Sequence, residues 1–433
     1  MKRVLIITYY WPPSGGAGVQ RWLKFVKHLR ENNWEPVVYT PINPEIPYRD
    51  ESLLHDIPTD IEVIGTKIFE PYAWYNMLTG KKKNAPFQHG FLKDQQDKKP
   101  RFSEQLAIWI RGNFFIPDAR AFWVRPSVRF LRDYIKNHPV DLIVSSGPPH
   151  SLHLIAKGLK KHSNLPWVAD FRDPWTGIYY FDKLKLTALA KKIHHRLEQQ
   201  CLDTADHIIT VGQTMKNDFA RRTTTPITVV TNGFDEEDFA EKGHSPSEKF
   251  SIFYSGMFLP DQNPTELWKV LQEIVNESTA FEQQLELRFI GRCDAKILQD
   301  ISDHDLNKHL VLEDYVPHAA LPALQQAASL LLLSINRIEN ASYILTGKVF
   351  EYLAAARPVL AFCPDNSDVA NIINETRSGY TIAFGQRTRL KALLLELFMQ
   401  QQNNQLRLTG QDVSAYSRKA LTKQMANIFN LHT

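Results

Sequence analysis

Short runs of consecutive apolar residues recur along the chain, and most are followed by a stretch with helical periodicity. The first run covers Val4–Thr8, and a second covers Pro36–Thr40 after an amphipathic stretch over Val19–Glu31. Runs of this kind are typical of parallel strands that helices bury on both faces. The start of the chain therefore predicts a βαβ unit, with the glycine-containing loop Tyr9–Gly18 between its first strand and its helix.

The same alternation resumes after residue 136 and again after residue 249. Apolar runs predict further strands at Ile61–Gly65, Leu142–Ser146, Pro166–Ala169, His207–Val211, Phe250–Tyr254, Leu285–Ile290, Leu310–Leu312, Leu330–Ile335, Pro358–Phe362 and Tyr380–Ala383. The polar stretch Asp235–Lys249 is the best linker candidate between the two sets.

We therefore expect an α/β fold with two Rossmann-like domains that face a cleft. The N-terminal domain is expected over residues 1–235 and the C-terminal domain over residues 236–412. Residues 413–433 contain the amphipathic stretch Ser414–Leu431, which is expected to pack back on the first domain as a helix.

Residues 42–136 interrupt the alternation of predicted strands and helices with a basic and aromatic insertion. Residues 81–136 hold thirteen Lys and Arg against five Asp and Glu, an excess of eight positive charges. Trp109 and Trp123 lie among these basic residues, with Phe114, Phe122 and Phe130. Aromatic rings between cations suit a membrane surface with anionic lipid. The alternative is that the rings pack under the domain while the basic residues form a solvated face.

Composition narrows the setting of the protein. The formal net charge of +4 over 433 residues is too small to predict a nucleic-acid partner. The three cysteines, Cys201, Cys293 and Cys363, are far apart in sequence, which fits a reducing compartment and excludes a disulfide framework. The sequence shows no signal peptide and no apolar run of about 20 residues. A cytoplasmic location is expected, peripheral at the inner face of the membrane if the basic segment binds lipid.

The stretch Thr346–Leu360 carries the clearest candidate chemistry, as a glycine turn, a short helix, a proline stop and a strand. Lys348 lies in the first helical turn, where its charge opposes the macrodipole unless an anion is bound. Phosphate is the natural candidate, bound by Lys348 and by free backbone N–H groups of Gly347 and its neighbours. Glu351, one turn later, can accept hydrogen bonds from a diol such as a ribose. The alternative is that Lys348 and Glu351 pair with each other in water.

Polar residues also follow two predicted strands of the first domain, where open α/β sheets bind their ligands. Gly15 and Gly16 lie in the first loop, and Asp170, Arg172 and Asp173 follow a later strand. The two aspartates are candidate catalytic residues that steer a sugar hydroxyl or stabilise developing charge. An internal ion pair that closes the loop remains the alternative. The glycines do not form G-x-G-x-x-G, so they predict a loop that admits a sugar or diphosphate, or a purely structural turn.

No metal or cofactor site is expected. Asp303-His304-Asp305 has the D-x-D form of some metal-dependent enzymes, but it falls in a helix or polar loop and not at a strand end. No local motif assembles a Ser/His/Asp or Cys/His triad. The expected catalysis is therefore positioning and electrostatic stabilisation of a leaving diphosphate.

The run Gly347–Ala354, followed by Arg357-Pro358, resembles the donor-site helix of GT-B glycosyltransferases in glycosyltransferase family 4. Further blocks resemble the same family in the same order: Pro12–Gly16, Asp170–Trp175, Asn232–Asp235, Tyr254–Gly256 and Tyr315–His318. The resemblance implies that Glu351 binds the donor's ribose, that Lys348 binds its diphosphate, and that Gly15 and Gly16 admit the diphosphate and sugar. It also implies a nucleotide-sugar donor held by the second domain and retaining transfer to an acceptor held by the first.

Two positions depart from the family pattern. A glutamate is common eight positions before the ribose glutamate, where this chain has Tyr343, and Glu339 is out of register. The basic pair common after the Gly256 strand is also absent, and Arg292 after the next strand is the candidate substitute.

The main hypothesis is a metal-independent glycosyltransferase acting on a lipid-linked or cell-envelope polysaccharide acceptor. The alternatives are a GT-B epimerase or hydrolase of the nucleotide sugar, and a catalytically weak binding module.

Overall fold

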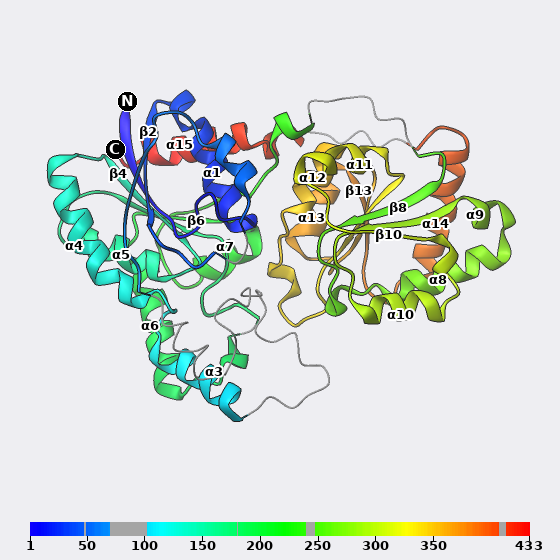
Figure 1. Cartoon of the computed structure of the whole chain (residues 1–433), viewed down its shortest axis with the longest axis horizontal. Helices are drawn as coiled ribbons and strands as arrows, with labels where there is room; N and C mark the ends of the chain where they lie inside the picture. The colour runs from blue at the N-terminus through cyan, green and yellow to red at the C-terminus, as the bar shows by residue number, and fades with distance from the viewer. Residues whose placement is uncertain (47–48, 70–101, 180, 240–246, 407–412) are drawn as a thin grey trace. The chain divides into compact units, whose positions relative to one another are not determined.

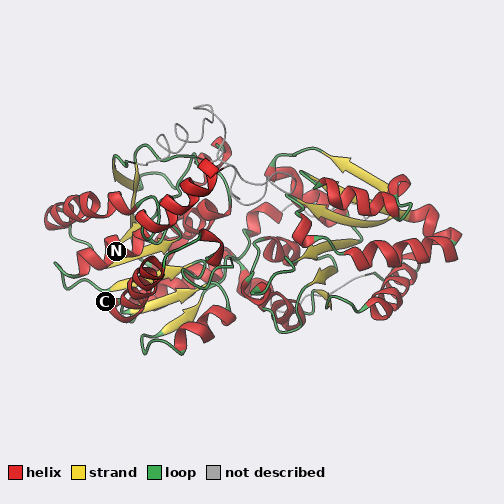
Figure 2. Cartoon of the chain, turned by 90° about the horizontal axis from the view of Figure 1, so that it is seen from below, coloured by secondary structure: helices red, strands yellow, loops and turns green. Residues whose placement is uncertain are grey.

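The computed structural model describes residues 1–46, 49–69, 102–179, 181–239, 247–406 and 413–433. The chain forms two compact units (Figure 1). Unit 1 comprises Met1–Thr231 together with Arg418–Thr433, and unit 2 comprises Asn232–Ser417. Each unit has one parallel sheet with helices on both faces, so the predicted α/β fold with two Rossmann-like sheets is confirmed (Figure 2).

The sheet of unit 1 has the order β3-β2-β1-β4-β5-β6-β7. Its strands are β1 (Lys2–Ile7), β2 (Trp34–Pro41), β3 (Glu62–Thr66), β4 (Leu142–Gly147), β5 (Trp167–Phe171), β6 (His207–Thr210) and β7 (Ile227–Val229). β7 was not predicted, because it is only three residues long and is the outermost strand of the sheet. The strand order reverses between β1 and β4, and ligands bind outside the carboxyl ends of the strands at such a point.

The helices of unit 1 cover both faces of this sheet (Figure 1). They are α1 (Ala17–Leu29), α3 (Phe102–Phe114), α4 (Ala121–Asn137), α5 (Ser151–Lys160), α6 (Ala188–Thr204), α7 (Gln213–Ala220) and α15 (Arg418–Asn430). The C-terminal helix α15 packs against α1. The Phe429 ring meets Trp34 at a centroid distance of 5.3 Å, and Arg418 donates to the Gln20 carbonyl at 3.0 Å.

Unit 2 repeats the architecture with the sheet order β10-β9-β8-β11-β12-β13. Its strands are β8 (Phe250–Ser255), β9 (Leu285–Ile290), β10 (Leu310–Glu313), β11 (Leu330–Ser334), β12 (Val359–Phe362) and β13 (Gly379–Ile382). Its helices are α8 (Thr265–Glu277), α9 (Thr279–Gln284), α10 (Ala295–Asp303), α11 (Leu321–Ala327), α12 (Lys348–Ala355), α13 (Asp368–Thr376) and α14 (Arg387–Gln402). Its order reverses between β8 and β11.

The aromatic residues of the basic segment divide into two sets. Trp123 is buried: its ring stacks on Tyr39 at 5.0 Å and its indole N–H donates to Thr66 Oγ1 at 2.8 Å. Phe114 and Phe122 are instead more than half exposed. The expectation that Trp123 meets a membrane is therefore wrong, because this ring belongs to the core of unit 1. The part of the segment over residues 81–101 lies outside the described residues. Within the described ranges, no helix is long and apolar enough to cross a bilayer.

Candidate functional site

In unit 2, two glycines bring the backbone close together where β8 and β9 end. Gly256 follows β8 with a φ of +100°, and Gly291 follows β9 with a φ of +102°. Both angles lie in a region that side chains disfavour. A Cβ atom at Gly291 would also lie 2.8 Å from the Gly256 carbonyl oxygen. Glycine is therefore required at both positions so that the loops after β8 and β9 can pack closely. This edge of the sheet, at the carboxyl ends of its strands, lies beside the point where the strand order reverses between β8 and β11.

Lys348, the first residue of α12, lies over this edge. Its Cε and Nζ would be 3.3 and 3.4 Å from a Cβ at Gly256. Its ammonium donates to Tyr254 Oη at 2.7 Å and lies 3.9 Å from the centre of that ring. Tyr254 Oη in turn donates to the Met257 carbonyl at 2.8 Å. Among the described residues, the Lys348 ammonium forms no ion pair with a carboxylate, so a neutral phenol holds the cation in place.

Burial lowers the pKa of Lys348 from 10.5 to about 7, and nearby Glu351 offsets only part of this effect. Removal from water disfavours the charged form of an amine. An anion bound at the ammonium would restore the charge. Binding of a negative ligand by Lys348 stays a prediction.

Glu351 lies one turn after Lys348 on α12 and is partly buried. Its Oε2 accepts a long hydrogen bond of 3.4 Å from Gln325, whose own Oε1 is buried without a partner within the described ranges. The first turn of α12 has fewer free backbone N–H groups than predicted. The N–H of Val349 bonds to the Thr346 carbonyl at 3.3 Å, and that of Phe350 bonds to the Gly347 carbonyl at 3.1 Å. The first turn of α12 thus satisfies these two donors itself.

Arg292 follows Gly291 on the same edge of unit 2 and is exposed. Its carbonyl accepts from the Phe258 N–H at 2.8 Å, which fixes its backbone beside the segment after β8. Its guanidinium makes no hydrogen bond or ion pair with any residue that the structure describes. The edge therefore carries one partly buried cation, Lys348, and one exposed cation.

In unit 1, Gly15 and Gly16 precede the N-terminus of α1, after β1. Gly16 has a φ of +102°, and a Cβ at this position would meet no atom within 4 Å. Conformation, and not crowding, therefore favours glycine at this position. The open space beside a helix N-terminus suits an anionic or polar group.

Asp170, at the end of β5, is completely buried. Its carboxylate accepts from Arg21 at 2.8 and 3.1 Å, and from Trp22 Nε1 and Ser146 Oγ at 2.8 Å each. Burial acts to raise its pKa, but the charge and hydrogen bonds of Arg21 outweigh burial and leave the pKa below its ordinary value. This is the internal ion pair of the alternative interpretation, with Arg21 as the partner. A catalytic role for Asp170 stays a prediction, and its carboxylate has no exposed surface in this structure.

Arg172 and Asp173 follow Asp170 with different surroundings. The Arg172 guanidinium donates to the Gly18 carbonyl at 2.9 Å and to the Pro148 carbonyl, which joins the first turn of α1 to the loops after β4 and β5. Its Nε is buried without a hydrogen-bond partner among the described residues. Asp173 is exposed beyond this junction. Of the two predicted catalytic carboxylates, Asp173 is the one that a ligand can reach.

Two histidines after β4 were not predicted as site residues. The His150 ring stacks on Trp175 at 4.9 Å, and its Nδ1 is buried without a partner in the part of the chain that the structure describes. Burial holds the pKa of His150 well below its usual range and lowers that of His153 to about 3, so both rings are neutral. A Cβ at Gly147 would lie 2.5 Å from His153 Nε2 and 3.0 Å from His150 Nδ1. The sequence signal was the run Gly147–His153, whose histidines lie three residues apart.

The described residues contain no group of three or more His, Cys, Asp or Glu side chains that could hold a metal ion. Asp303 is the last residue of α10, and His304 and Asp305 lie in the following turn. The D-x-D sequence therefore lies at a helix end, as predicted, and away from the carboxyl ends of the strands.

Solved structures with the same architecture cover nearly the whole chain. A glycosyltransferase from Rickettsia africae has a TM-score of 0.63 and 12% identity, covering 99% of this chain and 98% of its own. HepE from Anabaena, solved in complex with UDP-glucose, has a TM-score of 0.60 and 12% identity, covering 100% of both chains. A putative UDP-N-acetylglucosamine 2-epimerase from Listeria monocytogenes has a TM-score of 0.56 and 10% identity, covering 99% and 96%. At these identities the likeness establishes the fold.

A search of curated protein sequences finds no match to this chain. The sequence model of Glycosyltransferase Family 4 matches residues 15–238, more than half of the 433 residues. The resemblance seen in the sequence motifs is thereby confirmed. The chain is a glycosyltransferase and belongs to glycosyltransferase family 4.

Proposed function

We propose that the protein transfers a sugar from a nucleotide-sugar donor, with the donor's diphosphate on Lys348 and its ribose on Glu351. One observation carries the proposal. Lys348 lies at the β8/β11 reversal of unit 2, held by the Tyr254 phenol with no carboxylate partner among the described residues. Such a cation is available to an incoming diphosphate. HepE, which shares the fold, was solved with UDP-glucose, and this supports a nucleotide sugar as the donor.

In this proposal, the bond between the sugar's anomeric carbon and the diphosphate breaks as an acceptor hydroxyl bonds to that carbon. The acceptor's proton leaves with the diphosphate, whose charge Lys348 and Arg292 stabilise. In unit 2, Gly256 leaves room for the donor, and Gly347 begins the helix that carries Lys348. In unit 1, Gly15 and Gly16 leave room for a sugar or diphosphate group, and Asp173 orients the acceptor. Transfer is proposed to proceed with retention, without a metal ion, to a lipid-linked or cell-envelope polysaccharide.

The test is transfer from labelled nucleotide sugars to acceptors in a membrane extract, with wild type, Lys348→Ala and Glu351→Ala. Loss of one charge-stabilising contact typically lowers the rate by about 100-fold to 1,000-fold. Each variant is expected to lose at least about 100-fold while its unfolding transition stays unchanged. The exposed Lys269→Ala on α8 is a matched control that should keep full activity. Full activity in both site variants would show that the donor lies elsewhere.

A GT-B epimerase or hydrolase is the second candidate, because the Listeria epimerase shares the fold. It predicts that the donor is consumed when no acceptor is present. A catalytically weak binding module predicts donor binding without consumption, a consequence expected if Tyr343 and the missing basic pair weaken catalysis. An arm of the assay without acceptor, together with calorimetry of donor binding, separates all three outcomes.

We also infer that the protein works at the cytoplasmic face of a membrane. Apolar rings remain exposed on α3 and α4: Trp109 by 38%, Phe114 by 67% and Phe122 by 54%. The cations Arg125 and Arg129 on α4 are exposed as well. Rings of this kind enter the lipid interface while cations meet anionic headgroups.

Tryptophan fluorescence with phosphatidylglycerol vesicles tests this inference. Trp123→Phe should keep the blue shift that vesicles cause, because Trp123 is buried. Trp109→Phe should lose most of the shift, because its ring is exposed. No shift and no co-sedimentation of the wild type would remove the membrane from the proposal.

A further inference from the structure

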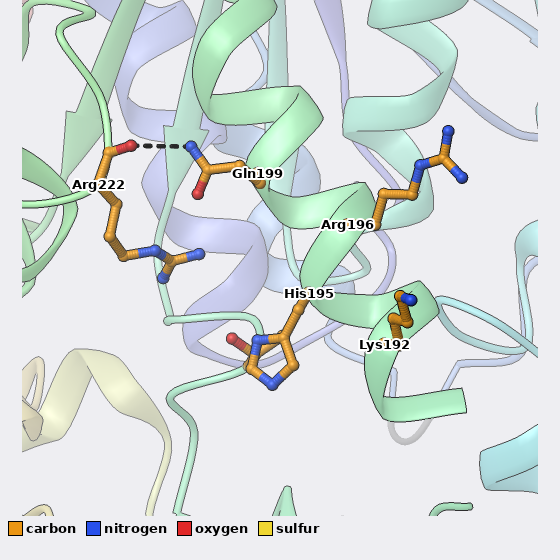
Figure 3. A pocket seen from close by; sticks show the side chains of 6 residues that line it. Lys192, His195, Arg196, Gln199 and Arg222 are labelled. Carbon is orange, nitrogen blue, oxygen red and sulfur yellow. Dashed lines mark hydrogen bonds between the residues drawn. The ribbon is translucent and has the colours of Figure 1, made fainter. Parts of the chain in front are cut away.

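Unit 1 contains a pocket of about 680 Å³ that is open to the surface and that none of the predicted site residues lines (Figure 3). This open pocket is called the cavity below. Four of its lining residues come from one face of α6, and two come from segments beside it. The lining residues are Thr176, Lys192, His195, Arg196, Gln199 and Arg222. None of them is acidic, and three carry a permanent positive charge.

Two of these charges have no counterion. Lys192 and Arg196 are exposed, and within the described ranges neither side chain forms a hydrogen bond or an ion pair. Arg222 differs, because its Nη2 lies 2.6 Å from Glu198 Oε2 and its Nη1 lies 3.7 Å from Asp218. The uncompensated charge of the cavity therefore comes from Lys192 and Arg196, one helical turn apart.

The acidic side chain behind the cavity is Glu198, and residues of unit 1 satisfy its carboxylate. Glu198 is completely buried and accepts from the Thr176 N–H at 3.2 Å and the Thr176 hydroxyl at 2.6 Å, in addition to Arg222. The two turns of α6 from Lys192 to Gln199 thus present their positive side to the cavity, and their buried carboxylate, Glu198, faces inward. A negative ligand would meet no acidic side chain on the lining.

The cavity is close to the carboxyl end of β5. Thr176 lies three residues after Asp173, so their Cα atoms are at most about 11 Å apart. The segment between them is fixed to α6 twice, because Trp175 Nε1 donates to His194 Nδ1 at 3.0 Å and Thr176 bonds to Glu198. A ligand with one end at Asp173 can therefore place a second group in the cavity.

We propose that this cavity binds a phosphate or diphosphate group of the acceptor. The inference rests on the proposed transfer function for its link to Asp173, but the binding of phosphate does not. Arg196 offers the planar fork that binds two phosphate oxygens at once, and Lys192 adds a mobile point charge. A volume near 680 Å³ is in the range of small-molecule sites and holds a phosphorylated sugar as well as a free ion.

The test uses inorganic pyrophosphate as the probe and full-length Lys348→Ala as the parent, so that the proposed donor site does not contribute. Calorimetry is expected to show pyrophosphate binding to the parent. Adding Lys192→Glu and Arg196→Glu should weaken it at least tenfold. Lys269→Glu with Lys423→Glu, two exposed lysines outside the cavity, makes the same charge change and should bind like the parent. Arg222 is left intact, since its loss would strand the buried Glu198 charge.

Equal pyrophosphate binding by the parent and the Lys192/Arg196 variant, or no binding by the parent, would overturn the proposal. The outcome is independent of the donor test. The wild type could bind no nucleotide while the Lys192/Arg196 variant loses pyrophosphate binding. That pair of results would keep the cavity as a phosphate site and remove the proposed transfer function.

Vesicles of phosphatidylcholine with phosphatidic acid, a lipid phosphate monoester, identify the source of the phosphate. Phosphatidylglycerol vesicles are the control for general binding to anionic lipid through α3 and α4. If the Lys192/Arg196 variant loses both pyrophosphate binding and the preference for phosphatidic acid over phosphatidylglycerol, the phosphate belongs to a lipid-linked acceptor. If it loses pyrophosphate binding but keeps the lipid binding of its parent, the phosphate belongs to a soluble ester. Either result supports the cavity as a phosphate site.

Discussion

The two sheets present charge at equivalent places, beside the reversal of strand order, and they treat it in opposite ways. In unit 1, Asp170 is buried with Arg21 and accepts hydrogen bonds from four side-chain N–H and O–H groups. In unit 2, Lys348 is only partly buried and has a neutral phenol as its hydrogen-bond partner. A charge satisfied from inside holds loops in place, whereas a charge held by a neutral group remains available to a ligand. A charged side chain at a sheet edge therefore indicates a binding site only where its partner is known and is not an opposite charge.

The largest expected effect follows from breaking the unit 1 pair. Asp170→Asn leaves the Arg21 charge buried without a counterion, and loss of one partner of a buried pair costs about 3–5 kcal/mol. The free energy of unfolding should fall by that amount in urea denaturation. Asp182→Asn is the matched control, because it removes the exposed partner of Lys191. Exposed pairs contribute about 0–1 kcal/mol. A similar small change in both variants would contradict the structural role of Asp170.

The fold was predictable where a local pattern determined it. The apolar run from Val4 and the helical stretch from Val19 each need burial on a known face, and they form β1 and α1. Trp123 was placed incorrectly because its partners Tyr39 and Thr66 are far away in sequence. No local rule tells whether an aromatic ring on an amphipathic helix packs inward or remains exposed.

The candidate site was predictable to a smaller extent. Local sequence identified Lys348 and Glu351 on one helix but suggested that they could pair with each other. The structure instead assigns Tyr254, almost a hundred residues earlier, as the hydrogen-bond partner of Lys348. The pair of Asp170 with Arg21 also spans two distant segments. Contacts of this kind depend on which strands are neighbours, and a single sequence does not give that order.

The next largest loss of stability is expected for Gly256→Ala in unit 2. A side chain at a positive φ costs about 1–2 kcal/mol, and the new Cβ would press on the Lys348 chain at 3.3 Å. We expect that loss in the free energy of unfolding, together with weaker nucleotide binding. Gly177→Ala in unit 1 is the stability control, since its Cβ would meet only Pro174 at an ordinary 3.4 Å. Unchanged nucleotide affinity in Gly256→Ala would separate Lys348 from the donor.

The pKa of Lys348 near 7 predicts how donor affinity depends on pH. Above pH 7 the amine of the free protein is mostly neutral, and a diphosphate must bind together with a proton. Affinity should therefore fall by up to about tenfold per pH unit between pH 7 and 9. The unfolded chain binds more protons than the native chain between pH 7 and the ordinary lysine pKa, so stability without ligand should rise over the same range.

Lys348→Arg supplies the control for pH, because a guanidinium keeps its charge throughout this range. Its nucleotide affinity should be independent of pH, whatever its absolute value. Titration calorimetry at three pH values measures both proteins. A pH slope that persists in the arginine variant would assign the titration to another group.

The smallest expected effect on stability belongs to Asp173→Asn. This side chain is exposed, so the free energy of unfolding should change by no more than about 0.5 kcal/mol. Sugar transfer should nevertheless fall, because Asp173 is the accessible carboxylate after β5. Retained transfer would remove Asp173 from the proposed mechanism and leave the unit 1 edge with its positioning role alone.

We propose that α12 of unit 2 binds the nucleotide of the donor. Its most direct test is thermal unfolding with uridine, guanosine and adenosine diphosphates and their sugars. A ligand at 100 times its dissociation constant adds about 2.7 kcal/mol to native stability. One nucleotide series is expected to stabilise the wild type and to leave Lys348→Ala and Glu351→Ala without stabilisation. No stabilisation of the wild type by any nucleotide, or equal stabilisation of all three proteins, would contradict it.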